Sequence, residues 1–228
     1  TSASAAGTDS SAFPVSISHV YGTPTNPKAP TRVATLGWSD QDFALALGVA
    51  PIGAIKITWG GNEKQSTPWY DAALARLGGA EPTRYDDSDG APIEEIAKLA
   101  PDLILATNSG ITKDEYAKLS KIAPVVAYPG DAWGTPWQAS LDLVSKALGR
   151  QEQAESVRKA TEDSIKAAAA KFPQTQGKTF IFGSMSPTDN SKIDYYTPLD
   201  NRPRLLVDMG MKNAPIIVLD EATSSLDS

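Results

Sequence analysis

The sequence contains no cysteine and a single histidine, His19. The lack of cysteine excludes disulfide bonds, thiolate metal sites and cysteine nucleophiles. One histidine cannot form the clusters that hold bare zinc or manganese, and a lone histidine is usually structural. The sequence also lacks the Gly-x-Ser-x-Gly and Gly-x-Gly-x-x-Gly turns of acyl-transfer and dinucleotide-binding enzymes. We therefore expect no enzymatic activity, no cofactor and no metal ion held directly by the protein.

Long apolar runs and an excess of positive charge are absent too. No run of apolar residues approaches the ~18 that a membrane-spanning helix requires. The formal net charge is −6 and the sequence pI is near 4.8. A nucleic-acid-binding face would need many Lys and Arg side chains to displace counterions from phosphates, so no nucleic-acid partner is expected. With 228 residues, 41% of them hydrophobic, the chain can bury a core in one or two domains.

From residue 31 onward, short apolar runs alternate with helix-length segments. This alternation predicts an α/β fold with a parallel sheet and helices on its faces. The predicted strands are residues 32–36, 52–55, 102–106 and 124–128. Predicted helix starts lie at Ser39, Pro68, Pro92, Thr112 and Thr135, and the pairs Thr112 with Glu115 and Thr135 with Gln138 are predicted capping boxes.

The chain divides into five predicted segments. Residues 1–12 are almost entirely Ser, Thr, Ala and Gly, a composition that favours a flexible tether. Residues 13–135 form an N-terminal α/β lobe, and residues 136–172 form connecting helices, the last of them about 33 Å long at ~1.5 Å per residue. Residues 173–213 begin a second α/β lobe that is too short to match the first. Residues 214–228 form a tail of different character.

Three segments resemble the N-terminal lobe of a known family of binding proteins. They are APTRVATLGW at residues 29–38, LALGVAPIG at residues 45–53 and APIEEIAKLAPDLILA at residues 91–106. The last is the most specific, because Pro101 ends a helix and residues 103–106 supply the continuous apolar run of a central parallel strand. Over residues 13–213 the chain resembles the ABC-importer binding proteins that carry siderophores, haem and cobalamin. Trp38, Trp59 and WGTPW at residues 133–137 are most similar to actinobacterial ferric-siderophore binders.

The resemblance implies two lobes with parallel sheets flanked by helices, joined by one long rigid helix, with the second lobe truncated. It implies a ferric siderophore held in the cleft between the lobes, with haem or cobalamin as the alternative ligands. The implied partners are the permease subunits of an ABC transporter, and the protein is expected to act as a monomer. The Ser/Thr/Ala/Gly head is similar to the spacer after a lipidated cysteine. It implies an extracytoplasmic protein anchored to the membrane by a lipid that this chain does not contain.

Ligands of open parallel sheets lie beyond the carboxyl ends of the strands, so the loops after the predicted strands are the expected site. Aromatic and polar side chains in these loops suit the apolar linkers and oxygen shell of a ferric chelate. The predicted ligand-binding residues are Trp38, Trp59, Tyr85, Asn108 and Trp133, with Lys56 and Arg84 as charge partners and Tyr195 and Tyr196 from the second lobe. The few clustered cations slightly favour a neutral hydroxamate complex over a trianionic catecholate.

Packing is the competing interpretation for each aromatic side chain taken alone. Trp69 and Trp137 each follow a proline in a first helical turn, so packing is favoured for both. For Tyr195 and Tyr196, a pair of sheet residues is an equally good interpretation.

Two acidic residues are candidates for docking to the permease. Glu94 matches the family's acidic position on the outer face of the first lobe, where a carboxylate would pair with permease arginines, although a solvated helix glutamate is the alternative. Asp208 is a weaker candidate on the second lobe, because Arg204 stands where the family has a glutamate.

Residues 212–227, KNAPIIVLDEATSSLD, resemble the Walker B and D-loop segment of an ABC-transporter ATPase. Asp220 takes the magnesium position and Glu221 that of the water-activating base. An ATPase also needs a phosphate loop, and the candidate at Gly177 to Thr179 has Phe172 where the first glycine belongs. A strand is also predicted there, where a helix should begin. We therefore expect both carboxylates to be inert, with an ATPase fragment as the alternative function.

Overall fold

A computed structural model of the chain describes residues 8–185, 189 and 193–215. The first lobe contains a five-stranded parallel sheet in the order β5-β4-β3-β6-β7. Its strands are β3 (Val33–Thr35), β4 (Gly53–Ile55), β5 (Thr83–Tyr85), β6 (Leu103–Ala106) and β7 (Val125–Ala127). The chain runs from β3 outward to β5, then crosses to β6 on the other side of β3. The connections of the sheet thus change direction between β3 and β6, which is the position where open parallel sheets bind their ligands.

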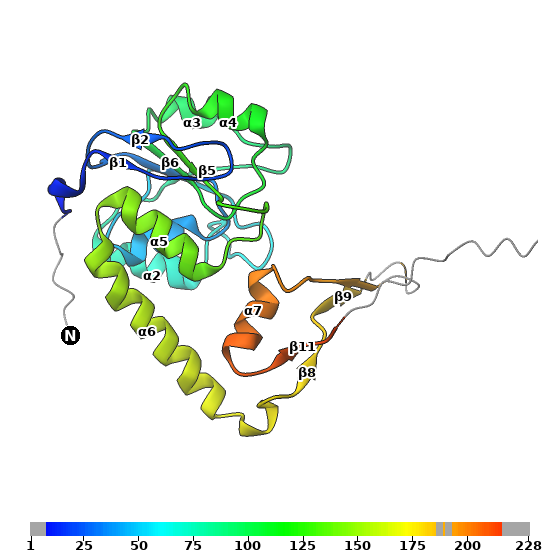
Figure 1. Cartoon of the computed structure of the whole chain (residues 1–228). Coiled ribbons are helices and arrows are strands. Elements are labelled where there is room, and N and C mark those ends of the chain that lie inside the picture. The colour runs from blue at the N-terminus through cyan, green and yellow to red at the C-terminus, as the bar shows by residue number, and fades with distance from the viewer. Residues whose placement is uncertain (1–7, 186–188, 190–192, 216–228) are drawn as a thin grey trace, which may run out of the picture.

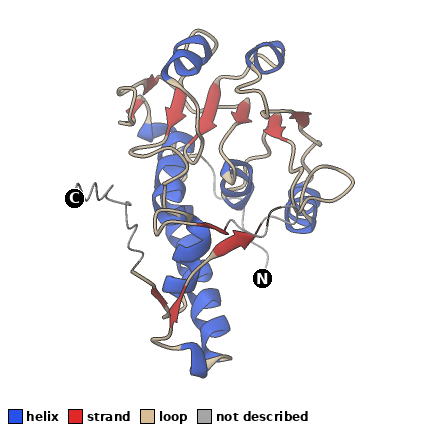
Figure 2. Ribbon diagram, turned by 90° about the vertical axis from the view of Figure 1, so that its right-hand side faces the viewer, coloured by secondary structure: helices blue, strands red, loops and turns tan. Residues whose placement is uncertain are grey.

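Helices cover both faces of this sheet (Figure 2). On one face, α3 (Ile93–Lys98) and α4 (Lys113–Leu119) bury Ile96 and Leu119 against side chains of β4, β6 and β7. On the other face, α1 (Asp40–Ala46) and α5 (Trp137–Leu148) cover β3 and β6, and α2 (Pro68–Leu77) packs beside α1. Burial of this apolar surface on both sides stabilises the lobe by roughly 25 cal/mol per Å². The predicted α/β fold is thus confirmed.

The predicted strands and helix starts of the first lobe are confirmed with small shifts at their ends. All four residues of β6 are buried, as expected for a central parallel strand. Thr112 forms the predicted capping box. Its Oγ1 accepts from the Glu115 N–H, and the Glu115 carboxylate accepts from the Thr112 N–H at 2.7 Å.

The second predicted capping box is wrong. α5 begins at Trp137 with Pro136 as its N-cap, and no side chain caps the helix. The Thr135 backbone instead contacts the second lobe. Its carbonyl accepts a hydrogen bond from Asn201 Nδ2 at 2.8 Å.

The N-terminal tether is shorter than predicted. Ser10–Ala12 form a 3-10 helix, and Asp9 caps it by accepting from the Ser11 N–H. The Asp9 N–H in turn donates to the Gly149 carbonyl at 3.0 Å, which fastens this segment to the turn after α5. The tether interpretation is therefore wrong for residues 8–12, and residues 1–7 lie outside the described part. The chain then enters β1 (Val15–Ser16), which pairs antiparallel with β2 (Thr25–Asn26).

A single long helix, α6 (Gln151–Ala170), leads from the first lobe to the second (Figure 1). After η2 (Pro173–Thr175), β8 (Thr179–Phe180) pairs in parallel with β11 (Lys212–Asn213). β9 (Gly183–Met185) and β10 (Ile193–Tyr195) form an antiparallel pair, and α7 (Asn201–Asp208) follows. No residue of these four strands is buried. The described residues of this lobe therefore form no buried sheet core of their own.

The ATPase-like tail falls almost entirely outside the described residues, and so do Asp220 and Glu221. The candidate phosphate loop is described. Lys178 leads directly into β8, and its carbonyl accepts from the Lys212 N–H at 2.9 Å. A phosphate loop instead opens a helix whose first amides face the phosphates. The predicted strand at this place is thus confirmed.

Candidate ligand-binding site

A cavity of about 750 Å³ lies between the two lobes. This volume falls within the ~300–1,000 Å³ of typical small-molecule sites. Its first-lobe wall comes from the segments that follow β3, β4, β6 and β7. Its second-lobe wall comes from β9, the residue after β10 and the beginning of α7. The lining residues are Trp38, Ser39, Phe43, Trp59, Asn108, Trp133, Trp137, Ser184, Tyr196, Asp200, Asn201 and Arg202.

Five residues that the sequence predicts as ligand contacts meet in this cavity. They are Trp38, Trp59, Asn108, Trp133 and Tyr196. The exposed fractions of Trp38, Trp59 and Trp133 are 45%, 77% and 47%, so these large rings are not used up by core packing. Their placement follows from the parallel sheet, whose strands all end at the same edge. Their role in binding stays a prediction.

The two loops at the switch point are tied together by a buried carboxylate. Asp40 Oδ2 accepts from the backbone N–H of Gly37 at 3.1 Å and of Thr107 at 2.9 Å, and Oδ1 accepts from the Thr107 hydroxyl. The Trp38 N–H also donates to the Asn108 carbonyl at 3.0 Å. Burial raises the pKa of Asp40 to about 6, against the opposing effect of these hydrogen bonds. The carboxylate thus holds Trp38 and Asn108 beside each other.

Gly37 is required for this contact. A Cβ atom at this position would lie 2.1 Å from Asp40 Oδ2, closer than any non-bonded approach allows. Asn108, on the second of the two loops, is 7% exposed, and its Oδ1 has no hydrogen-bond partner in the described structure. A buried acceptor without a partner is costly unless a ligand or water supplies the donor.

The Trp133 side chain is held by an unusual backbone conformation. Its φ is 60°, in the left-handed region that bulky residues rarely adopt. The backbone N–H of Trp133 donates to the Ser109 carbonyl at 3.0 Å. The Trp133 indole lies against Gly110, where an added Cβ would come within 2.4 Å of Nε1. Strain of this kind persists only where surrounding contacts determine it, and it is common at ligand sites.

α7 closes the cavity by contacting the segment between β7 and α5. Arg204 donates to the Gly134 carbonyl at 2.8 Å, and Trp137 Nε1 donates to Asp208 Oδ2 at 3.2 Å. The Asp208 carboxylate therefore faces the first lobe. Asp208 thus takes part in the contact between the lobes while remaining exposed, and its docking role stays a prediction.

The second-lobe wall carries an arginine that is already paired. Arg202 donates from Nε to Asp200 Oδ1 at 2.8 Å and from Nη2 to Oδ2 at 2.6 Å. Its guanidinium carbon lies 3.6 Å from the centroid of the Tyr196 ring. The hydrogen bond from the Arg202 side chain lowers the pKa of Asp200. The pair is thus an ion pair stacked on an aromatic ring.

Four predicted contacts are not found among the residues that line the cavity. Tyr85 is fully buried, and its hydroxyl donates to the Thr35 carbonyl at 2.6 Å. This residue ends β5 itself, so the alternation of side chains along the strand turns it into the core. Its prediction as a ligand contact is wrong. Tyr195 is the last residue of β10 and is exposed, but it does not line the cavity.

The two predicted charge partners are used elsewhere. Arg84 donates to Gln41 Oε1 at 2.5 Å, to the Ile55 carbonyl at 3.0 Å and to Ser66 Oγ at 3.1 Å. Lys56 pairs with Asp86 at 3.8 Å. Both side chains thus have partners within the first lobe, and neither lines the cavity; their role toward the ligand stays a prediction.

Sequence reasoning missed several lining residues. Trp137 packs partly against the core, as predicted, but it also lines the cavity. Phe43 lies one turn into α1 and would have been found by extending the search from the loop after β3 into the helix. Asp200 could have been noticed as a good N-cap residue, since it stands directly before α7. Trp69 is 49% exposed, so the favoured packing interpretation fails for it.

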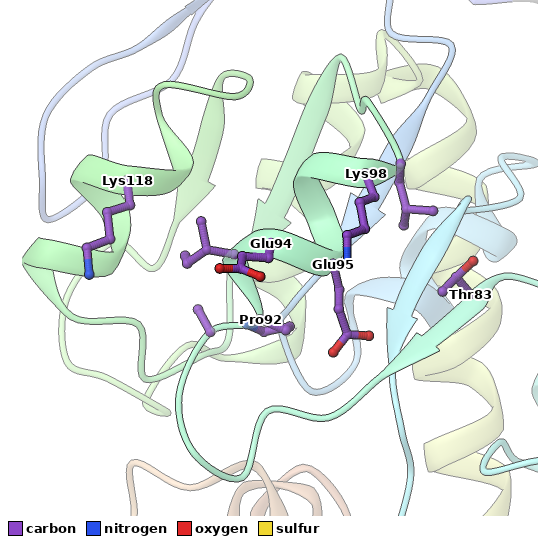
Figure 3. Close-up of a pocket in the computed structure, with 9 residues that line it drawn as sticks. Thr83, Pro92, Glu94, Glu95, Lys98 and Lys118 are labelled. Atoms are coloured by element: carbon purple, nitrogen blue, oxygen red, sulfur yellow. The ribbon is translucent and has the colours of Figure 1, made fainter.

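Glu94 lies far from this cavity, on α3. Figure 3 shows Glu94, Glu95 and Lys98 on α3, with Lys118 on the neighbouring α4, around a shallow surface pocket. These helices cover the face of the first lobe that is turned away from the second lobe (Figure 1). Glu94 is exposed there, and its docking role stays a prediction.

Two searches of the described residues found nothing. Within residues 8–185, 189 and 193–215, no three His, Cys, Asp or Glu side chains are grouped so that they could hold a metal ion. In the same residues no helix has both the length and the apolar character to cross a membrane.

Comparison with known proteins gives consistent matches. Residues 33–215 match the model of the periplasmic binding protein family. A probable siderophore-binding lipoprotein of Bacillus subtilis is 30% identical over 142 residues, which cover 62% of this chain and 40% of the relative. The chain spans 40% to 62% of the length of the curated relatives that it matches.

Solved structures match over most of the chain. The iron uptake ABC transporter substrate-binding protein PiaA of Streptococcus pneumoniae, in complex with ferrichrome, is 38% identical with a TM-score of 0.82, covering 87% of this chain and 67% of PiaA. A periplasmic solute binding protein of Mycobacterium smegmatis is 33% identical with a TM-score of 0.76, covering 89% and 70%. These matches include proteins from different bacterial groups, so the narrower resemblance to actinobacterial binders stays a prediction. The chain belongs to the periplasmic binding protein family.

Proposed function

We propose that the chain binds a ferric siderophore between its lobes and delivers it to the permease of an ABC importer. The observation that carries this proposal is the cavity itself, which is walled by aromatic rings from both lobes. A ferric siderophore is a bulky complex with apolar linkers and a shell of oxygens around iron. Flat rings with a few polar atoms match such a surface, and no residue needs to reach the iron.

The relatives support the same proposal. One is described as a probable siderophore-binding lipoprotein, and another was solved with ferrichrome. We propose from the lipoprotein relatives that the chain works outside the cytoplasmic membrane, held there by a lipid anchor. We expect it to act as a monomer and to carry out no covalent chemistry.

Tryptophan fluorescence provides the test. Titration of the 228-residue chain with ferrichrome and with ferric enterobactin is expected to quench its emission, because the iron chromophore would lie beside Trp38, Trp59 and Trp133. Iron-free siderophore, haem and cobalamin are the comparison ligands. Lack of quenching by both ferric chelates, together with quenching by haem or cobalamin, would move the proposal to those ligands.

Two tryptophan variants separate binding from general quenching. Trp59 lines the cavity and is 77% exposed, whereas Trp69 on α2 is 49% exposed and does not line it. Trp59→Ala is expected to weaken chelate binding on the order of tenfold, since a stacked aromatic contact contributes about 1–2 kcal/mol. Trp69→Ala is expected to leave the affinity unchanged. Equal effects of the two substitutions would contradict the assignment of the cavity. Calorimetry with MgATP, which is expected to show no binding, tests the alternative of an ATPase fragment.

A further inference from the structure

The charge of the cavity is carried by one pair of residues. Among the lining residues in the described part of the chain, only Asp200 and Arg202 are ionised at neutral pH. The others are aromatic side chains or carry neutral hydroxyl and amide groups. Asp200 and Arg202 carry opposite charges, so the described lining has no net charge.

The arginine is not free to serve as a counterion. Both oxygens of Asp200 accept from its side chain, and Oδ1 also accepts from the Arg202 backbone N–H at 2.8 Å. Stacking on Tyr196 fixes the plane of the guanidinium. Two of its five side-chain N–H groups are used on the carboxylate, and the remaining ones can donate to neutral oxygen acceptors of a ligand.

The other described cations near the cavity do not line it. Arg204, two residues further along α7, directs its guanidinium to the Gly134 carbonyl at 2.8 Å. Lys56 and Arg84, the nearest candidates from sequence, are engaged with Asp86 and with the Gln41 and Ser66 side chains. A ligand with several negative charges would therefore lose hydration in the cavity without finding an unpaired positive charge among the described lining residues. Burying charge in this way is strongly unfavourable.

We infer that the cavity selects an uncharged ferric trihydroxamate, and that Asp200 determines this specificity by cancelling the charge of Arg202. This inference rests on the proposed function and names the ligand class of the same site. The buried, unpartnered Asn108 Oδ1 adds an acceptor for an amide N–H of such a ligand. A trianionic tris-catecholate would need the arginine that Asp200 already occupies.

The test compares two chelates of different charge on the full chain. Ferrichrome is an uncharged trihydroxamate, and ferric enterobactin is a trianionic tris-catecholate. The wild-type chain is expected to bind ferrichrome on the order of a hundredfold more tightly, because no counter-charge offsets the desolvation of the anion. Since the two chelates also differ in shape, the decisive quantity is the change of this ratio in Asp200→Asn.

Asp200→Asn removes the charge and keeps the N-cap of α7, because Asn caps as well as Asp. In this variant, the ratio of ferrichrome affinity to ferric enterobactin affinity is expected to fall by about tenfold or more, because ferric enterobactin binds more tightly. Asp194→Asn is the matched control. Asp194 lies on β10 in the same lobe, is exposed and does not line the cavity, so this variant changes the net charge equally. Its ratio is expected to equal that of the wild type.

Three results would overturn the inference while the proposed function stands. They are equal wild-type affinity for the two chelates, an unchanged ratio in Asp200→Asn, and an equal change of the ratio in Asp194→Asn. Absence of binding by every ferric chelate would instead overturn the proposed function and the inference together. Circular dichroism of each variant confirms that it is folded before its affinity is compared.

Discussion

Replacement of the buried Asp40 provides a quantitative test of how the loop after β3 is held to the loop after β6. Asn has the same shape as Asp and can keep all three contacts, with its oxygen accepting from the Gly37 and Thr107 N–H groups and its nitrogen donating to the Thr107 hydroxyl. Ala keeps none of them. It leaves the buried Thr107 N–H without a partner, while the Gly37 N–H retains only its 3.4 Å hydrogen bond to the Leu105 carbonyl. Asp40→Asn and Asp40→Ala therefore separate the effect of the charge from that of the hydrogen bonds.

The magnitude follows from the pKa. Burial raises the pKa of Asp40 from 3.8 to about 6, so the ionised carboxylate destabilises the folded state at pH 7 by about 3 kcal/mol, at ~1.4 kcal/mol per pKa unit. The folded state binds more protons than the unfolded state between these two values. The contribution of Asp40 to stability thus increases as the pH falls from about 7 to about 4.

Asp40→Asn removes this dependence. Its free energy of unfolding, minus that of the wild type, is expected to grow by about 3 kcal/mol between pH 4 and pH 7. Asp40→Ala is expected to be about 1–3 kcal/mol less stable than Asp40→Asn, the cost of the unsatisfied Thr107 N–H donor. Burial also raises the pKa of the neighbouring Asp42, to about 7. Asp42 is present in both proteins, so most of its effect on the free energy of unfolding cancels when Asp40→Asn is compared with the wild type.

Urea unfolding followed by circular dichroism at pH 4, 5.5 and 7 measures these free energies. A difference between Asp40→Asn and the wild type that does not vary with pH would refute the idea that burial governs this carboxylate. Equal stability of the Asn and Ala variants would refute its role in holding the loops together.

Three further outcomes are expected. Gly110→Ala places a methyl group 2.4 Å from Trp133 Nε1, so it should displace the indole and weaken chelate binding on the order of tenfold in the fluorescence titration; unchanged affinity would show that the indole is not needed. Thr112→Ala removes the capping box with Glu115 and should lower the free energy of unfolding by about 1 kcal/mol, whereas Thr112→Ser should retain it. Glu94→Lys should leave the chelate affinity of the purified chain unchanged and abolish siderophore-dependent uptake in cells; normal uptake would remove Glu94 from the docking surface.

Much of the first lobe could be predicted because its signals are local. Apolar runs bounded by prolines mark β6 and β7, and the Thr112–Glu115 pair marks α4 without reference to distant residues. Tyr85 shows the limit of such reasoning. β5 is only three residues long, and nothing in so short a run tells whether the aromatic side chain belongs to the strand or to the loop after it. The pairing of β5 with β4 places Tyr85 in the strand. Such pairing joins residues that are distant in sequence, so it cannot be read from the residues around Tyr85.

The site was predicted in part for the same reason. Trp38, Trp59, Asn108 and Trp133 follow strands and therefore reach the common edge of the sheet. The contacts of Arg84 and Lys56 could not be predicted in this way, because their partners are distant in sequence. The position of the second-lobe wall depends on the contacts that Arg204 and Asp208 of α7 make with the first lobe. These contacts join residues about seventy positions apart in sequence, so local patterns do not predict them.

The long helix α6 affects how the two walls of the cavity move relative to each other. Its first half is held by the first lobe, because Val157 packs against the core and Arg158 pairs with Asp142 of α5. Its later turns are supported mainly by the intrinsic preference of alanine and by pairs such as Lys159 with Asp163, 2.5 Å apart. The bending stiffness of these later turns therefore contributes, together with the hydrogen bonds between α7 and the first lobe, to how widely the two walls can fluctuate. Substitutions along these turns, such as alanine to glycine, would broaden the range of ligand sizes admitted without altering a single atom that a ligand touches.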